Sequence, residues 1–321
     1  METSSQIGNG KNVAFIVGSP RSGTTWLLRL LACSPDIRSG SESYLFANYI
    51  DPLLKSWQKE AGRRGKSAGG RAQLVGLSTN VTEDEFMGAV RAFAVSLLSS
   101  MKPDLGPGQV FIEKTPDHAL HLEVIMRTLP DSKVIHIVRD ARDVVASILR
   151  VQRELGWELS RPNARSAAKL WVNHVRGARS VQGKLTSERF LEVRYETLLS
   201  ETKETVRKVL AFLGVRWEES DLERTMQALQ ADNIRTGAGK PIRIRGEASK
   251  DLGQEFQMPK EFVGKATAGN WVKDLSWSQK FWVWYVAGET MKEFGYDWNP
   301  PAWYSLASLV VRPAVGLGHQ I

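Results

Sequence analysis

Four short apolar segments recur along the first two thirds of the chain, and each is followed by a pattern typical of a helix. These segments are Asn12–Val17, Gln109–Glu113, Lys133–Val138 and Phe190–Val193. Their high content of Val, Ile and Phe is typical of parallel strands that are buried on both faces. The alternation of such strands with helices predicts an α/β protein, in which helices flank a central parallel sheet of four or five strands.

The helix pattern is clearest at residues 200–214, SETKETVRKVLAFLG. Apolar residues recur there at helical spacing, which predicts one buried face. They are Val206, Val209, Leu210 and Leu213. We expect Ser200 to cap the amino end of this helix and Gly214 to end it. A second helix is expected in the Trp-rich segment 276–296, whose aromatic stripe is typical of a core.

Two long segments lack such a pattern. Residues 44–108 separate the first two strands and include the Gly/Arg-rich stretch 61–71, which we expect to be a mobile loop. That stretch is either a solvated basic linker or part of a substrate-recognition surface. Residues 229–268 are polar and rich in Gly, Lys and Arg, and they predict long loops before the Trp-rich helix.

Length and composition indicate one folded domain. The chain has 321 residues, enough for a sizeable core, and 42% of them are hydrophobic and 24% charged. No internal repeat and no linker divides the chain, so we expect a single domain over residues 1–321. Its core is expected at residues 12–300, followed by an apolar tail at residues 301–321 that packs against the domain or against a second subunit.

Charge and cysteine content narrow the function classes. The net charge of +8 favours phosphorylated or polyanionic partners, but no DNA- or RNA-binding signature points to nucleic acid. Cys33 is the only cysteine, so an intrachain disulfide and a cysteine-rich metal site are excluded, and no other metal-ligand spacing is present. The amino terminus has no signal-peptide pattern, and no apolar run reaches the roughly 18 residues of a membrane helix. We therefore expect a cytoplasmic protein that uses no metal.

The segment VAFIVGSPRSGTTWLLRLL, residues 13–31, predicts a strand, a glycine-containing loop and a helix, the layout that holds phosphate groups. Gly18 and Gly23 have the spacing of a P-loop, and backbone N–H groups at the start of the helix would face an anion. Thr24 stands where a nucleotide triphosphatase has the lysine that reaches the β- and γ-phosphates. Arg21, inside the loop, can instead donate a bidentate pair of hydrogen bonds to one anionic group.

This loop resembles the 5′-phosphosulfate loop of sulfotransferases that use 3′-phosphoadenosine 5′-phosphosulfate (PAPS). The resemblance implies that six consecutive residues bind the 5′-phosphosulfate: Pro20, Arg21, Ser22, Gly23, Thr24 and Thr25. A second segment, SKVIHIVRDARDVVASILR, has Arg139 at the turn after a strand and Ser147 eight residues later. This spacing is similar to that of the family's 3′-phosphate motif, although Arg139 taken alone could pair with Asp140 or Asp143.

The resemblance implies a P-loop NTPase-like three-layer α/β sandwich that transfers a sulfuryl group from PAPS to a hydroxyl group, leaving adenosine 3′,5′-bisphosphate (PAP). Two further segments are similar to cofactor-binding parts of the family. The first, LEVRYETLL, has Tyr195 at the end of a strand. The second, GKATAGNWVKDLS, supplies Lys265, Gly269 and Trp271, but Gly264 stands where cytosolic members often have arginine.

Sulfuryl transfer requires a base for the acceptor proton and cations for the transferring group. Pro116 replaces the histidine base of the phenol and steroid sulfotransferases. The segment SPDIRSGSESYLF instead resembles the tyrosyl-protein sulfotransferases, and Glu42 falls on their catalytic glutamate, while EKTP resembles the lysine motif of the heparan sulfotransferases. The resemblance therefore implies Glu42 as the base, with Arg21 and Lys114 stabilising the sulfuryl group and the bridging oxygen.

Alternatives exist both for the base and for the function. Glu42 could be a loop carboxylate paired with Arg38. His118, four residues past Lys114, could be the base, or else a polar surface residue on the first turn of a helix. The alternative functions are a P-loop kinase or phosphotransferase, which a requirement for Mg²⁺ would favour, and a non-catalytic protein that binds PAP or another nucleotide.

The acceptor is expected to be a hydroxyl-bearing small molecule, glycan or lipid. Residues 44–108 and 229–262 are expected to shape its site, and no pattern within them identifies the acceptor. Within the first of these segments, the aromatic residues Tyr44, Phe46 and Tyr49 would suit stacking on a ring, or would equally suit a place in the core.

Overall fold

The computed structural model describes residues 8–62, 76–101, 105–155, 163–228, 242–243, 255–256, 268–296 and 304. Five parallel strands form the central sheet, in the order β2-β3-β1-β4-β5. They are β1 Val13–Val17, β2 Ile37–Ser39, β3 Val110–Glu113, β4 Lys133–Val138 and β5 Phe190–Arg194. The four expected strands are confirmed to within one residue at each end. The short edge strand β2 was not expected, because only its first residue, Ile37, is buried.

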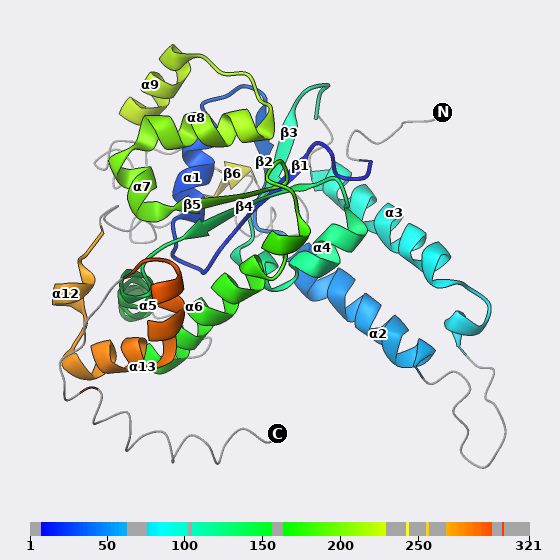
Figure 1. Cartoon of the computed structure of the whole chain (residues 1–321). Helices are drawn as coiled ribbons and strands as arrows, with labels where there is room; N and C mark the ends of the chain where they lie inside the picture. Colours follow the sequence, from blue (N-terminus) through cyan, green and yellow to red (C-terminus); the bar gives the residue numbers. More distant parts are fainter. Residues whose placement is uncertain are drawn as a thin grey trace, which may run out of the picture.

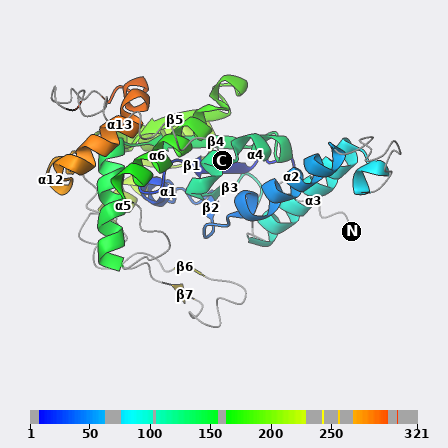
Figure 2. The ribbon, with the colours of Figure 1, turned by 90° about the horizontal axis from the view of Figure 1, so that it is seen from below.

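Helices cover both faces of the sheet, as Figure 1 shows. The α-helices are α1 Thr24–Leu31, α2 Asp51–Ala61, α3 Glu83–Met101, α4 Leu122–Thr128, α5 Ala141–Leu155, α6 Ala164–Arg179, α7 Tyr195–Ser200, α8 Thr202–Leu213, α9 Glu219–Ala228, α12 Trp271–Asp274 and α13 Trp277–Glu293. Tighter or wider turns form η1 Phe46–Ile50, η2 Leu77–Thr79, η3 Pro116–Leu120 and η4 Gln182–Lys184. Two-residue strands, β6 Ile242–Arg243 and β7 Glu255–Phe256, pair antiparallel outside the central sheet (Figure 2).

Alternate residues of the central strand β1 point into two different core clusters. Val13, Phe15 and Val17 pack in a cluster with residues of η1, α2, α3 and α4. Ala14 and Ile16 pack on the other face, with residues of α1, α7 and α8. All five side chains are buried, as expected for a strand covered by helices on both faces. A third cluster joins α5, α6 and α13.

The position of β1 in the sheet determines where the predicted site residues lie. β1 pairs with β3 on one side and with β4 on the other. Parallel strands end at the same edge of a sheet, so the loop after Val17, Lys114 after β3 and Arg139 after β4 lie next to one another there. Ligands of α/β proteins bind outside this carboxyl edge.

The helix expected at residues 200–214 is confirmed, except at its amino end. Its four apolar residues are buried, and Gly214 ends it with a left-handed backbone (φ 73°). The expectation that Ser200 caps it is wrong. Ser200 is the last residue of α7, and its hydroxyl donates to the carbonyl of Glu196 at 3.2 Å. Residues 195–200 form a helical turn of their own, so α8 begins only at Thr202.

The Trp-rich helix is confirmed as α13, and its aromatic side chains divide between core and surface. Phe281 is buried, whereas Trp277 at the amino end is largely exposed. Tyr304, from the expected tail, is buried against this helix: its ring stacks on Phe281 at 5.6 Å, and its hydroxyl donates to the carbonyl of Trp277 at 3.1 Å. At this residue the tail packs against the domain.

Several expected features lie outside the described residues. They are residues 63–75 of the Gly/Arg-rich region, most of residues 229–267 and, apart from Tyr304, the tail at 301–321. The expectation of a single domain stays a prediction. Within the part of the chain that the structure describes, no helix combines the length and the apolar character needed to cross a bilayer.

Candidate active site

Close packing around two glycines shapes the phosphate loop. A Cβ atom on Gly18 would come within 2.4 Å of the carbonyl oxygen of Ile137 in β4. A Cβ atom on Gly23, whose φ is 99°, would come equally close to the ring of Tyr195. No side chain fits at either position, so the loop is pressed against the residues that end β4 and follow β5.

Arg21 connects the two predicted phosphate motifs. Its backbone is left-handed (φ 72°), which costs free energy for a residue other than glycine and is frequent at functional sites. Its Nε donates to the hydroxyl oxygen of Ser147 at 3.3 Å, and Nη1 of Arg139 donates to its carbonyl oxygen at 3.2 Å. The loop after β1 and the turn after β4 therefore form one site.

Three guanidinium groups converge at this site. Burial, followed by the charges of Arg150 and Arg139, lowers the pKa of Arg21 to about 10. Ser22 lies in the same loop, and its buried hydroxyl has no hydrogen-bond partner among the described residues. An anion with several oxygens would suit this place. It would balance the guanidinium charges, accept a hydrogen bond from the Ser22 hydroxyl and face the amino end of α1.

Arg150, which the sequence patterns did not single out, is close enough for its charge to lower the pKa of Arg21. It lies on α5, three residues after Ser147, and neighbours at that spacing share one face of a helix. This spacing is the signal by which it could have been found.

Tyr195 begins α7 at the end of β5 and packs under the site. The guanidinium of Arg139 lies 4.3 Å from the centre of its ring, a cation–π geometry. Burial raises the pKa of the Tyr195 phenol. The structure therefore brings Tyr195 together with Arg139 and Gly23, and its role in cofactor binding stays a prediction.

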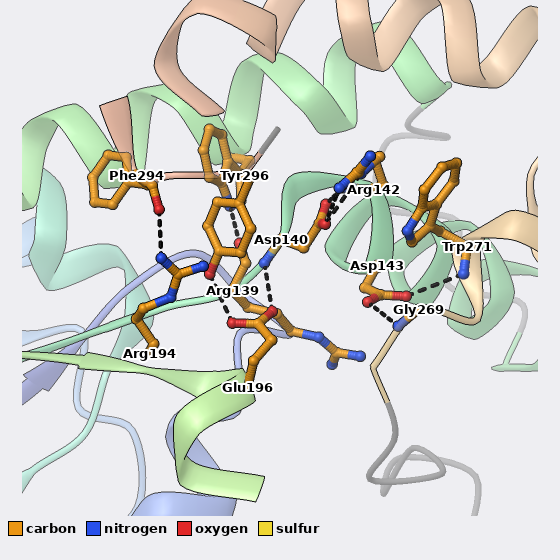
Figure 3. A network of polar contacts seen from close by, with 11 residues as sticks. Arg139, Asp140, Arg142, Asp143, Arg194, Glu196, Gly269, Trp271, Phe294 and Tyr296 are labelled. Atoms are coloured by element: carbon orange, nitrogen blue, oxygen red, sulfur yellow. Dashed lines mark hydrogen bonds and ion pairs between the residues drawn. The ribbon is translucent and has the colours of Figure 1, made fainter. Parts of the chain in front are cut away.

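The carboxylates beside Arg139 hold other groups (Figure 3). Asp140 accepts from Nε of Arg142 at 2.9 Å and from Nη2 of the same guanidinium at 2.5 Å. Asp143 accepts from the backbone N–H groups of Gly269 at 2.7 Å and Trp271 at 3.1 Å. Gly269 and Trp271 are thus held one helical turn from Ser147 on α5, and the guanidinium of Arg142 covers the Trp271 ring at 4.2 Å. Lys265 lies outside the described residues.

A second carboxylate network supports the turn that carries Arg139. Glu196 accepts from the backbone N–H of Asp140 at 3.0 Å and from the hydroxyl of Tyr296 at 2.8 Å. Nη1 of Arg194 donates to the carbonyl of Phe294 at 2.6 Å, next to the contact between Tyr296 and Glu196 (Figure 3). Burial and the Glu196 carboxylate raise the pKa of Tyr296. The end of α13 is therefore tied to the predicted 3′-phosphate motif, which no local pattern predicted.

Glu42 and Lys114 form an ion pair between Oε1 and Nζ, across 72 positions of sequence. Lys114 is buried, with 7% of its side chain exposed, whereas 31% of the Glu42 side chain is exposed. The alternative pairing of Glu42 with Arg38 is wrong: Arg38 donates to the backbone carbonyls of Pro35 and Ile37. The hydroxyl of Tyr44 donates to Oε2, the second oxygen of Glu42, at 3.3 Å.

Glu113, directly before Lys114, is a buried carboxylate with several partners. It accepts from the hydroxyl of Ser43 and from the hydroxyl of Thr115, each at 2.7 Å, and from the backbone N–H of Ser43 at 3.1 Å. Its other oxygen lies 2.7 Å from Nδ1 of His118. Burial alone would raise the pKa of Glu113, but His118 and these hydrogen bonds outweigh it and lower the pKa below its usual range.

His118 is a core residue. Its side chain is 0% exposed and lies between the rings of Phe15 and Phe46, with centroids 5.8 and 5.3 Å away. The expectation of a polar surface histidine is wrong, because η3 turns this side chain back under the sheet edge. A fully buried ring beside Glu113 has no access to an acceptor, which disfavours it as the base.

The aromatic residues after Glu42 differ in their surroundings. Phe46 is fully buried in the core, Tyr49 is exposed, and Tyr44 is half-buried with its hydroxyl on Glu42. Tyr44 also has a left-handed backbone (φ 50°). Of the three, Tyr44 is therefore placed where an acceptor ring could meet it. Among the described residues, no group of three or more His, Cys, Asp and Glu side chains is arranged to hold a metal ion.

Comparisons with known proteins agree with this geometry. A family model described as "Sulfotransferase family" matches residues 14–219. A putative protein-tyrosine sulfotransferase of Caenorhabditis briggsae is 29% identical over 217 residues, which are 67% of this chain and 70% of the relative. The protein-tyrosine sulfotransferase of Drosophila melanogaster is 27% identical over 209 residues, 65% of this chain and 39% of the relative. The chain thus spans less than half of the Drosophila relative.

Two solved structures have the same fold. The crystal structure of mouse sulfotransferase SULT7A1 complexed with PAP has a TM-score of 0.53 at 16% identity, covering 88% of this chain and 85% of that one. The sulfotransferase domain from the Synechococcus PCC 7002 olefin synthase has a TM-score of 0.51 at 20% identity, covering 89% and 95%. At these identities the likeness concerns the fold, and it confirms the expected helix-flanked parallel sheet.

Proposed function

The chain belongs to the sulfotransferase family, and we propose that it transfers the sulfuryl group of PAPS to a hydroxyl group of an acceptor, leaving PAP. The observation that carries the proposal is the contact between the two motifs before α1 and α5: Arg21 donates to Ser147, and Arg139 donates to the carbonyl of Arg21. A dianionic phosphate and a phosphosulfate are the kind of ligand that such a pair of motifs binds. The bound PAP of the mouse SULT7A1 structure supports the same cofactor.

The cofactor residues divide between the two motifs. Residues 20–25 would bind the 5′-phosphosulfate through backbone N–H groups and through the unsatisfied hydroxyl of Ser22. Arg139 and Ser147 would bind the 3′-phosphate, and Arg150 adds a third cation beside them. Gly269 and Trp271 would support this end through Asp143, and the role of Lys265 stays a prediction.

The Glu42–Lys114 pair is suited to the transfer step. The acceptor oxygen attacks sulfur, the bond from sulfur to the bridging oxygen breaks, and its electron pair stays on the phosphate of PAP. Glu42 takes the proton of the acceptor hydroxyl. Lys114, already next to Glu42, supplies positive charge for the bridging oxygen as it becomes negative.

The acceptor is a hydroxyl-bearing molecule. Curated relatives are named protein-tyrosine sulfotransferases, which favours a phenolic hydroxyl as the first to try, beside glycan and lipid alcohols. The half-buried ring of Tyr44 beside Glu42 supports an aromatic acceptor. A cytoplasmic location and the absence of nucleic-acid partners stay predictions.

The decisive experiment measures binding and transfer separately. The full chain is titrated with PAP by calorimetry in the absence of metal, with ATP and Mg²⁺ as the control titration. It is then incubated with ³⁵S-labelled PAPS and a tyrosine-containing peptide, an oligosaccharide and a long-chain alcohol.

We expect metal-independent binding of PAP and label on at least one acceptor. Binding of ATP with Mg²⁺ but not of PAP would overturn the proposal in favour of a kinase. Binding of PAP without transfer to any acceptor would favour a non-catalytic nucleotide-binding protein.

A further inference from the structure

The turn that carries Glu42 is held by side chains at the end of a different strand. Residues 40–45 lie between β2 and η1. The backbone N–H of Ser43 donates to Oε1 of Glu113 and to Oγ1 of Thr115, each at 3.1 Å. The hydroxyl of Ser43 donates to Glu113 and accepts from the backbone N–H of Leu45 at 3.1 Å. These contacts fix the backbone of the turn directly after Glu42.

Three consecutive residues, Glu113 at the end of β3 and the two that follow it, hold the turn through different contacts. Glu113 and Thr115 hold the backbone and hydroxyl of Ser43, while Lys114, between them, pairs with the side chain of Glu42. The end of β3 therefore contacts two adjacent residues of the turn, Glu42 and Ser43. The peptide between Glu42 and Ser43 is planar, so fixing the Ser43 amide also orients Glu42.

Glu113 is itself rigidly placed. It is 1% exposed, and His118 faces its second oxygen from η3 at 2.7 Å. The three hydrogen bonds that Oε1 accepts from Ser43 and Thr115, together with burial, restrict Glu113 to one position, which is what a template for the turn requires.

We propose that Glu113 is a positioning residue for catalysis: it holds the Glu42 turn against β3, so that Glu42 stays beside Lys114. This inference rests on the proposed function, in which Glu42 is the base. Glu113 is buried and does not touch the acceptor or the cofactor, so it acts only through Glu42 and Lys114.

The test uses variants on both sides of the contact. Glu113→Gln removes the charge at nearly constant volume. Because this variant can fail to fold, a double variant, Ser43→Ala with Thr115→Val, removes the two hydroxyls that join the turn to Glu113 and leaves Glu113, His118 and the Ser43 amide in place. Glu192→Gln is the matched control: Glu192 also pairs with a buried histidine, His136 at 3.1 Å, but in β5 and far along the chain from the turn.

Three measurements are made on each folded variant of the full chain. Hydrogen–deuterium exchange of peptides that contain Ser43 and Leu45 reports on the two anchored amides without requiring activity. Calorimetry with PAP reports on the phosphate-binding residues. Turnover with the best acceptor of the wild type reports on kcat and on the acceptor KM separately.

In the Glu113 and Ser43/Thr115 variants we expect faster hydrogen exchange at the turn. We expect kcat to fall by at least about ten-fold, because a small misplacement of catalytic groups slows the reaction steeply. PAP affinity is expected to stay within about two-fold, since the phosphate-binding contacts are untouched, and Glu192→Gln should change none of the three. Unchanged exchange at the turn, or faster exchange with unchanged kcat, would overturn the inference. A wild type that binds PAP but transfers to no acceptor would instead contradict the proposed function, and the exchange result would still decide whether Glu113 anchors the turn.

Discussion

Around the phosphate loop, three guanidinium groups approach one another, and burial with the charges of Arg150 and Arg139 lowers the pKa of Arg21 to about 10. Around the Glu42 turn, the carboxylates have partners within the protein: Lys114 pairs with Glu42, and Glu113 lies beside His118 and accepts hydrogen bonds from Ser43 and Thr115. Both regions lie at the carboxyl edge of the same sheet, on either side of β1. They differ in whether their charges are balanced within the protein.

This difference indicates two separate tasks. Like charges held together raise the free energy of the unliganded protein, and an anion that binds among them relieves the repulsion. Paired charges and shared hydrogen bonds hold groups in place before the substrate arrives, which is the arrangement that catalysis favours. Changes in the first region should therefore alter PAP binding, and changes in the second should alter turnover.

The largest effect is expected at the base. Glu42→Gln keeps the shape of the side chain but removes its ability to accept a proton, so kcat should fall by about 10²- to 10⁴-fold. PAP affinity should stay unchanged, because Glu42 is outside the phosphate-binding region. Steady-state turnover with labelled PAPS and PAP calorimetry check this. Glu123→Gln, an exposed carboxylate paired with Lys184, is the control. A loss of turnover smaller than ten-fold would exclude Glu42 as the base.

The next largest effect is expected at Arg139. Arg139→Ala should weaken PAP binding about 100-fold, the result of losing one or two charge-assisted hydrogen bonds. Arg139→Lys keeps the charge but loses the planar fork and its contact with the Tyr195 ring, so an intermediate loss of about ten-fold is expected. Calorimetry measures both. The control is Arg127→Ala, on the surface and paired with Glu83. Equal affinity of wild type and Arg139→Ala would refute the assignment.

A smaller effect is expected at Ser147. Its hydroxyl accepts from the guanidinium of Arg21, so Ser147→Ala should weaken PAP binding by about ten-fold, the result of one lost hydrogen bond to a charged group. kcat at saturating PAPS should change little. If kcat falls while PAP affinity stays unchanged, Ser147 acts on turnover and not on binding. That result would contradict the division of tasks between the phosphate loop and the Glu42 turn.

The smallest effect on the site is expected at Glu192, where only stability should change. Burial would raise the pKa of Glu192, but hydrogen bonds from His136 and Arg179 outweigh it and lower the pKa from 4.5 to about 2. A lowered carboxyl pKa stabilises the fold above pH 4.5, and this stabilisation is lost as the pH falls towards 2. Thermal unfolding should therefore show a lower Tm for Glu192→Gln near neutral pH, and a difference from wild type that shrinks in acid. A difference that is independent of pH would contradict this.

Much of the fold followed from local patterns. The apolar segments located four of the five strands, and β4 was located to the residue, because central parallel strands consist almost entirely of buried apolar side chains. The edge strand β2 was missed because it is short and mostly exposed. Ser200 was misassigned as a cap because two short helices meet there without a break in the polar pattern.

The candidate site was predictable only in part. The phosphate loop and the Arg139–Ser147 spacing are local patterns, so their anion-binding chemistry could be stated in advance. The Glu196–Tyr296 contact depends on neighbours from other elements. The burial of His118 likewise depends on where η3 lies against β1 and η1.

Which residues can bind phosphate and which can exchange a proton was readable from the amino-acid sequence, because those properties belong to side chains and to the backbone of a short loop. Which charges balance each other depends on the folded arrangement of the strands and helices. The strand order β2-β3-β1-β4-β5 sets Lys114 beside Glu42, 72 positions away, and the packing of α5 against the loop after β1 sets Ser147 beside Arg21, 126 positions away. Ion pairs and hydrogen bonds act over a few ångströms, so their partners follow from the folded arrangement and not from distance along the chain.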